Sequence, residues 1–215
     1  MAEETTIELK RAALNHYFQN LNTPQQQAVF HVNGPVLVLA GAGSGKTTAM
    51  IHRIVQMIHF GDGWVQANAS ITKEDAAYLK DYIAGKQPAD LERLCSILAV
   101  QPIQPWHILA ITFTNKAANE LRSRLLQAIG EECASMLHAS TFHSACVRIL
   151  RRSISKLGYD SNFTIYDTDD SQRLMKSCIA DADVSEKQFP PRAVLTEISL
   201  AKDRMCSPEY FCIEA

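Results

Sequence analysis

The chain has 215 residues, of which 47% are apolar and 20% charged, and its net charge is −2. No apolar run is long enough to cross a bilayer, and the first residues lack the basic segment of a signal peptide, so we expect a soluble, cytoplasmic protein. A charge so close to zero excludes a global field that attracts nucleic acid or membranes. Any nucleic-acid binding must therefore come from a local surface.

The first elements in chain order are helical. Residues 5–20 have the pattern of a short amphipathic helix. A second helix is expected to begin with Thr23 as its N-cap and Pro24 in its first turn. Residues 36–40 form an unbroken apolar run that predicts a buried parallel strand, and residues 48–60 have a helical pattern. A strand followed by a helix indicates the start of an α/β domain.

Residues 61–105 interrupt this pattern as an insertion. Thr72 begins one helix with a sequence similar to a capping box, Gly85 ends that helix, and Pro88 opens another. We expect a helical hairpin that packs on the domain. Its residues indicate no function of their own.

Beyond the insertion, apolar runs alternate with helical patterns up to residue 166, and only helical patterns follow. The alternation predicts a doubly wound parallel sheet, and the change at residue 166 predicts a boundary to a second, helical unit. We therefore expect an α/β domain over residues 1–166 and a helical unit over residues 167–215. The remaining elements are expected as strands at residues 108–113, 136–141 and 163–166, and as helices at residues 115–129, 142–157, 168–182 and 191–205.

The glycine-rich turn Ala-Gly-Ala-Gly-Ser-Gly-Lys-Thr, residues 40–47, lies between the first predicted strand and a helix. This is the context of a phosphate-binding loop, in which glycines let successive N–H groups point at an anion and the helix dipole adds to the attraction. Lys46 would reach the β- and γ-phosphates of a nucleotide, and the Thr47 hydroxyl would bind Mg²⁺. Ala40 replaces the first glycine of the pattern but is also small.

A second segment, residues 112–118, follows a predicted strand at the sheet edge where open α/β sheets bind ligands. Hydroxyl and amide groups surround Phe113, which suits phosphate contacts and base stacking in single-stranded nucleic acid. The alternative is an N-cap at Thr114 or Asn115 beside a core phenylalanine.

A third segment, residues 140–144, follows another predicted strand and leads into a helix that begins near His143. On this helix Arg148, Arg151 and Arg152 fall within about 100° of one another, opposite the apolar residues. They predict a local basic face for nucleic acid. The alternative is an ordinary solvated face.

Together these motifs resemble the N-terminal part of the UvrD/Rep/PcrA group of superfamily 1 DNA helicases. The resemblance covers essentially the whole chain except the insertion, with four motifs in order. The similar segments are residues 21–29 (Q motif), 40–47 (motif I), 112–118 with Glu120, Leu121 and Arg124 (motif Ia), 141–144 (the next DNA-contacting motif), 163–167 and 198–202.

The resemblance implies a RecA-like P-loop NTPase domain 1A over residues 1–166 and the beginning of a helical domain 1B over residues 167–215. ATP and Mg²⁺ are the implied cofactors, and single-stranded DNA is the implied partner, with a 3′-tailed duplex for the full-length parent. Gln25 would read the adenine edge. Thr48 stands where the group often has an arginine that packs on adenine, which puts nucleotide affinity and base selectivity in doubt. The implied ATP-binding residues are Gln25, Ala40, Gly41, Ala42, Gly43, Ser44, Gly45, Lys46, Thr47 and Thr48, and the implied DNA-binding residues are Thr112, Phe113, Thr114, Asn115, His143, Arg148, Arg151 and Arg152.

The group also has a Walker B acidic motif and a second RecA-like domain with arginine fingers, and neither occurs in these 215 residues. The acidic cluster at residues 167–170 matches the group's domain junction instead. We therefore expect an N-terminal fragment of an ATP-dependent 3′–5′ DNA helicase or translocase of repair, recombination or replication. By itself it should not turn over ATP, because the missing groups position Mg²⁺ and stabilise charge.

Three other interpretations remain open. The chain could be a non-catalytic module that binds nucleotide and single-stranded DNA, or part of a RecB/AddA-type helicase–nuclease. Lys116 and the junction at residues 163–167 favour the UvrD/Rep group over the latter. A small P-loop kinase would need a phosphoacceptor site and a lid, and the three motifs at one sheet edge argue against it.

Overall fold

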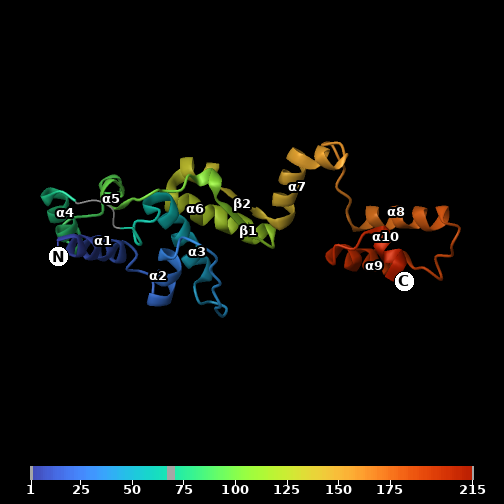
Figure 1. The fold of residues 1–215 in the computed structure, drawn as a ribbon, viewed down its shortest axis with the longest axis horizontal. Coiled ribbons are helices and arrows are strands. Elements are labelled where there is room, and N and C mark those ends of the chain that lie inside the picture. Colours follow the sequence, from blue (N-terminus) through green and yellow to red (C-terminus); the bar gives the residue numbers. More distant parts are fainter. Residues whose placement is uncertain (1, 67–70, 215) are drawn as a thin grey trace. The chain divides into compact units, whose positions relative to one another are not determined.

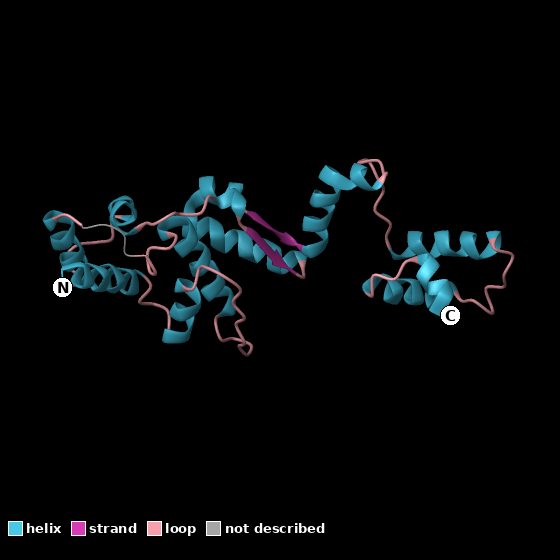
Figure 2. Cartoon of the chain, viewed as in Figure 1, coloured by secondary structure: helices cyan, strands magenta, loops and turns pink. Residues whose placement is uncertain are grey.

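A computed structural model describes residues 2–66 and 71–214 (Figure 1). The chain divides into two compact units, residues 1–149 and residues 150–215. Both are dominated by helices, and the only strands in the described residues are a parallel pair in the first unit (Figure 2). No described helix has the length and apolarity needed to span a membrane.

The sheet pairs β1 (Leu109–Thr112) with β2 (His138–Thr141) in parallel, with Leu109 opposite His138 and Thr112 opposite Thr141. The crossover between them is α6 (Asn115–Met136), which packs on both strands. Its backbone leaves the helical region at Gly130, where φ is 77°, as expected for a residue without a side chain. The strands predicted at residues 108–113 and 136–141 are confirmed. The architecture is α/β, compatible with an incomplete RecA-like domain.

Two predicted strands are wrong. Residues 36–40 and residues 163–166 have no strand structure. The first run is also largely exposed, with 82% of Leu37 and 85% of Leu39 accessible to solvent. A strand needs a neighbour to pair its N–H and C=O groups, and within the described residues β1 and β2 pair only with each other. Apolar character alone was therefore insufficient to predict these strands.

Two of the first helices of the chain carry or directly follow the nucleotide motifs. The first three are α1 (Ala2–Tyr17), α2 (Thr23–Phe30) and α3 (Lys46–Val55), and α3 continues into the π-helical turn η1 (Gln56–Phe60). The N-cap of α2 is Asn22 rather than the predicted Thr23. The Asn22 side chain accepts from the Gln25 N–H, and the Gln25 side chain accepts from the Asn22 N–H, which makes a capping box.

The insertion is a pair of helices, α4 (Lys73–Ile83) and α5 (Leu91–Leu98), followed by the 3₁₀ turn η2 (Pro105–His107). Thr72 caps α4 as predicted, whereas α5 begins after Asp90, three residues beyond Pro88. Helix α4 packs on α1, and Leu79, Leu94 and Leu98 are fully buried.

The two ends of the insertion meet at one point. Gly61 forms an isolated parallel bridge with Val100, and the Asp62 N–H donates to the Val100 carbonyl at 2.8 Å. A Cβ atom on Gly61 would lie 2.2 Å from the Val100 oxygen, so only glycine allows this approach. The bridge brings the chain back to the domain beside the place where it left.

The core of the first unit forms between α1, α2, α3, the insertion, α6 and the sheet. Phe18 and Phe60 are almost completely buried, with ring centroids 6.3 Å apart, and Tyr17 and Phe30 pack against them edge to face. Aromatic pairs of this geometry add to the stabilisation from apolar burial. This cluster holds α2 and α3 in place.

The second unit has little core of its own. It holds the end of α7 (Phe142–Ser153), the 3₁₀ turn η3 (Ile154–Leu157), α8 (Thr168–Asp181), α9 (Pro191–Asp203) and α10 (Pro208–Glu214). Helices α8 and α9 pack together, but among its described residues only Ile179 and Ala201 are buried. Burial on this scale contributes little to stability.

Replacing Gly61 by alanine should destabilise the first unit strongly, because a Cβ atom would overlap the Val100 carbonyl and the backbone has a φ of +52°. Gly85→Ala is the matched control, since Gly85 also has a positive φ but open space around it. The control should lose about 1–2 kcal/mol of unfolding free energy from backbone strain alone. Urea denaturation should show a larger loss for Gly61→Ala, and equal losses would contradict the close approach.

Candidate nucleotide and nucleic-acid site

The glycine-rich loop, residues 40–47, leads directly into α3. Gly43 and Gly45 have φ angles of 76° and 81°, which residues with side chains rarely adopt. Gly45 is the N-cap of α3, and no side chain caps this helix end. The first N–H groups of α3 are therefore available to an anion, and the helix dipole favours negative charge there.

Lys46 folds back over the loop. Its ammonium donates to the carbonyls of Ala40 at 2.9 Å and Gly41 at 2.6 Å, while the Ser44 hydroxyl donates to Gly41 at 2.7 Å. These bonds hold the cation at the loop, beside the free N–H groups of α3. Cation and helix N-terminus together make a site for a multiply charged anion.

Gln25 joins α2 to the loop. Its side-chain amide donates to the Ser44 carbonyl at 3.1 Å, and a Cβ atom on Gly45 would lie 2.4 Å from the same nitrogen. The amide thus contacts the loop backbone. A Cβ atom at position 45 would displace this amide, which is the flexible end of a side chain, and the φ of 81° is the stronger reason for glycine there.

A pocket of about 260 Å³ lies between α2 and the loop. It brings together three segments of the sequence, the Q-motif region, the apolar run before the loop, and the start of α3. Thr47 and Thr48 lie outside its lining, Thr47 being exposed and Thr48 half-buried. The residues that line it are Asn22, Pro24, Gln25, Ala28, Val38, Leu39, Ala40, Ser44, Gly45, Lys46 and Ala49.

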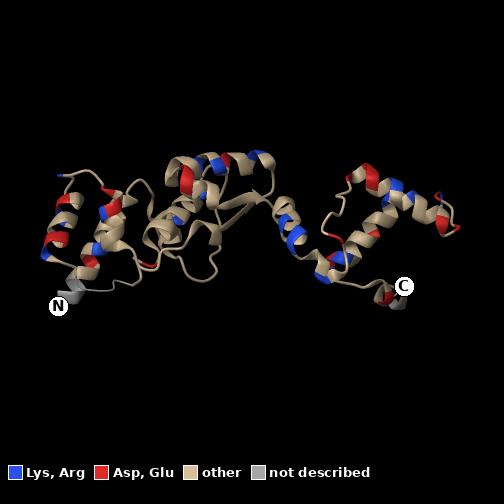
Figure 3. Cartoon of the chain, turned by 90° about the horizontal axis from the view of Figure 1, so that it is seen from above, with Lys and Arg blue, Asp and Glu red and all other residues tan. Residues whose placement is uncertain are grey.

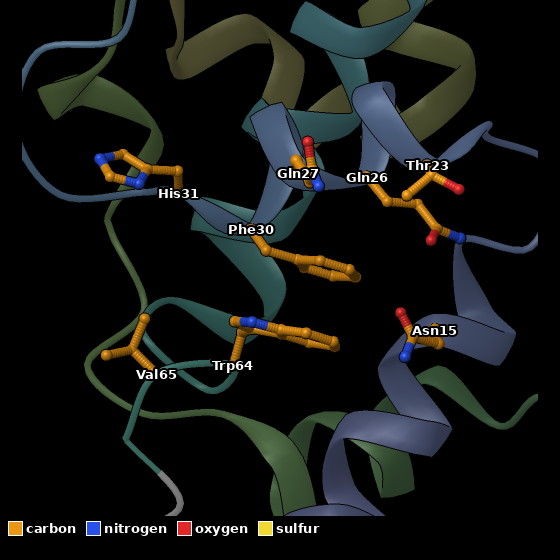
Figure 4. A pocket seen from close by; sticks show the side chains of 8 residues that line it. All are labelled: Asn15, Thr23, Gln26, Gln27, Phe30, His31, Trp64 and Val65. Atoms are coloured by element: carbon orange, nitrogen blue, oxygen red, sulfur yellow. The ribbon is translucent and has the colours of Figure 1, made fainter.

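A larger pocket, of about 590 Å³, lies on the opposite face of α2 (Figure 4). The rings of Phe30 and Trp64 line it side by side, stacked 3.9 Å apart and 4° from parallel. Asn15 from α1 and Gln26 from α2 lie at the far edges of the rings. None of the predicted site residues lines this pocket.

The carboxyl ends of β1 and β2 form the other half of the candidate site. Because Thr112 is opposite Thr141, the residues that follow them, Phe113 and Phe142, emerge side by side. Their ring centroids are 5.3 Å apart at an interplanar angle of 38°. Phe113 is 86% exposed and Phe142 46% exposed. The structure therefore has two neighbouring aromatic rings at this edge.

Phe142 is a residue that the sequence analysis missed, because helical spacing grouped it with the inward apolar residues of its helix. The available signal was the repeated Thr-Phe pair, which ends both strands. Two exposed rings at one edge offer a better stacking surface than one.

Both helices that leave this edge are capped by threonines. Thr114 accepts from the Ala117 N–H at 3.1 Å, as the N-cap alternative requires, and Thr141 accepts from the Ser144 N–H at 3.3 Å. Asn115 and His143 are exposed in the first turns of α6 and α7. Phe113 is not a core residue, so that part of the alternative is wrong.

The arginines of α7 give this helix the basic character visible in Figure 3. In the first unit, Arg148 contacts the Nδ1 atom of His138. In the second unit, Arg151 donates to the Ser161 carbonyl and lies 4.1 Å above the centroid of the Phe163 ring. Arg152 is exposed. Two of the three predicted DNA-binding arginines therefore also make contacts within the protein.

Within the described residues, helix α3 and η1 bury three polar side-chain atoms that have no hydrogen-bond partner. These atoms are His52 Nδ1, Gln56 Oε1 and His59 Nε2. Burial lowers the pKa of both imidazoles below the usual 6.5, and at His52 the nearby Thr48 backbone opposes this. Both rings are therefore neutral near pH 7.

Comparison with known proteins identifies the family of the chain. A family model described as the UvrD/REP helicase N-terminal domain matches residues 21–68 and 84–213. The match leaves out residues 69–83, which include all of α4, and the whole of α1.

Among curated proteins, the chain is similar to the ATP-dependent DNA helicase PcrA of Bacillus subtilis, with 38% identity over 197 residues. That alignment covers 92% of this chain and 21% of the relative. The PcrA proteins of Staphylococcus epidermidis and Staphylococcus aureus are each 36% identical, over 91% and 92% of this chain. The chain spans about a fifth of the length of these relatives.

Acidification should destabilise the first unit through His52 and His59. Their pKa values are lowered by folding, so the unfolded chain binds more protons, and stability present above pH 6.5 is lost as the pH falls below it. Thermal melts between pH 7.5 and 5 should show this fall. It should be smaller in a His52→Leu/His59→Leu variant and unchanged in His31→Gln, which alters an exposed ring. Identical profiles for all three proteins would contradict the assignment.

Proposed function

Because the chain belongs to the UvrD/REP helicase N-terminal domain family, we propose that it is the ATP- and single-stranded-DNA-binding part of an ATP-dependent DNA helicase or translocase. The parent protein moves 3′ to 5′ along DNA and acts in the cytoplasm in repair, recombination or replication. Residues 1–166 form part of domain 1A, and residues 167–215 the opening of domain 1B. A 3′-tailed duplex is the substrate of the full-length protein.

The pocket between α2 and the loop carries the nucleotide part of this proposal. Its residues fit Mg·ATP, because a cation, free N–H groups of α3 and a side-chain amide converge on it. Mg²⁺ supplies charge neutralisation at the phosphates when it is bound with ATP. Lys46 holds the phosphates and Thr47 binds the metal. The remaining loop residues supply N–H groups, and Gln25 faces the base.

The edge of the sheet carries the DNA part. Phe113 and Phe142 offer two ring faces for bases, and Thr112, Thr114, Asn115 and His143 supply polar groups for the backbone. Bases of any sequence can stack on such rings, which suits a protein that moves along DNA. The arginines of α7, Arg148, Arg151 and Arg152, add positive charge.

Lys46→Ala should abolish binding of Mg·ATP and Mg·ADP, since it removes the main cation at the phosphates. Isothermal calorimetry on the 215-residue chain measures this directly. Lys73→Ala, which removes an exposed lysine of α4, is the matched control and should bind as the unaltered chain does. Equal affinity in the Lys46 variant would exclude the loop as the phosphate site.

Phe113→Ala should weaken binding of single-stranded DNA by about 1–3 kcal/mol through lost stacking. Fluorescence anisotropy with a labelled oligonucleotide should also give a shallow salt dependence, equivalent to about two to four phosphates. Phe142→Ala should weaken binding as well, whereas Phe189→Ala, an exposed ring of the second unit, should not. Unchanged affinity in both edge variants would leave the two rings without a role in binding.

Residues 1–215 alone should show no steady ATP turnover, with or without DNA. They contain no Walker B carboxylates and no arginine fingers, which position Mg²⁺ and stabilise the transferring phosphoryl group. A phosphate-release assay at saturating Mg·ATP tests this. DNA-stimulated turnover of about 1 s⁻¹ or faster would show that these residues suffice for catalysis.

A further inference from the structure

Arg53 of α3 is bonded to the C-terminal end of α2. One terminal nitrogen of its guanidinium donates to the Ala28 carbonyl at 2.7 Å and also to the His31 carbonyl, and the other donates to the Val32 carbonyl at 3.3 Å. The planar fork of arginine can serve several acceptors in one plane, whereas lysine presents a single ammonium. The guanidinium of Arg53 thus binds three backbone carbonyls between residues 28 and 32.

These carbonyls need a partner. The last carbonyls of a helix have no partner within it, and positive charge is favourable at that end. Helix α2 has only eight residues, too few for stability in isolation, so its position depends on contacts with the rest of the protein. Arg53 is one such contact, and it is half-buried between the two helices.

The N-terminal end of α2 is attached to the same part of the chain. Gln25 donates to the Ser44 carbonyl, and the capping box with Asn22 fixes the Gln25 side chain. Helix α2 is therefore held at both ends by the segment that runs from the loop through α3. If the contact at one end is lost, the helix can shift at the other.

We propose that Arg53 is a positioning residue that fixes α2 on α3, and so determines how well Gln25 distinguishes adenine from other bases. This inference rests on the nucleotide site proposed above. Arg53 does not line the pocket, so its effect passes through α2. It should control recognition of the base and leave recognition of the phosphates largely intact, because Lys46 and the N-terminus of α3 remain in place.

The test compares the affinities of the 215-residue chain for Mg·ATP, Mg·GTP and Mg·tripolyphosphate by calorimetry. Arg53→Met should lower the affinity for ATP by about tenfold and reduce the ATP-to-GTP ratio to that of Gln25→Ala. Tripolyphosphate, which has no base, should bind within about twofold of the unaltered chain. The double variant Arg53→Met/Gln25→Ala should lose no more selectivity than either single variant, since both substitutions act through the position of Gln25.

Arg122→Met is the matched control, because Arg122 also donates to a backbone carbonyl, that of Ala139 in β2, at 2.8 Å. It should keep the ATP-to-GTP ratio of the unaltered chain. Arg53→Lys should have an intermediate ATP-to-GTP ratio. If circular dichroism shows that Arg53→Met does not fold, the ratio of Arg53→Lys tests the role of Arg53 instead.

The outcomes separate this inference from the proposed function. Loss of all three ligands in Lys46→Ala, together with retained selectivity in Arg53→Met or in a folded Arg53→Lys, would overturn the role of Arg53 alone. Equal binding of ATP and GTP by the unaltered chain would overturn it too, because no selectivity would exist for Arg53 to control. If Lys46→Ala binds all ligands normally, the nucleotide site itself is wrong.

Discussion

The contact between Gln25 and the loop backbone at Ser44 and Gly45 is the constraint on which the nucleotide pocket depends. Gly45 has a positive φ at the start of α3, and a Cβ atom there would displace the Gln25 amide from its present position. Glycine accommodates both features. The helix that carries Gln25 and the loop that carries Lys46 can therefore lie together, although they come from separate parts of the chain.

At the nucleic-acid edge, the register of the sheet brings together residues from separate parts of the chain. Parallel pairing of Thr112 with Thr141 aligns the two strand ends, and the next residue of each strand places its ring beside the other. A helix also begins directly after each strand, and a threonine caps each of these two helix starts at the same edge. Rings and helix N-termini together suit a ligand with stacked bases and a phosphate backbone.

Helices α1 and α4 contribute none of the predicted site residues. The bridge between Gly61 and Val100 closes the base of the insertion, and α4 extends from there to pack on α1. Helices α1 and α4 lie entirely outside the family match, and they pack on each other. An insertion with its ends joined can grow without moving the helices and strands on either side of it, because loop closure costs little extra for added length.

The sequence by itself determined the features that depend on near neighbours. The glycine-rich loop, the N-cap at Thr72, the break at Gly130 and most helices follow from spacings of a few residues, and they were predicted. Family membership also followed, because motifs are local. Strands at residues 36–40 and 163–166 were wrongly predicted, because a strand exists only where another one pairs with it. The pairing of Phe113 with Phe142 and the bonds from Arg53 to α2 were decided by the tertiary structure alone, since they join residues whose proximity arises only from packing.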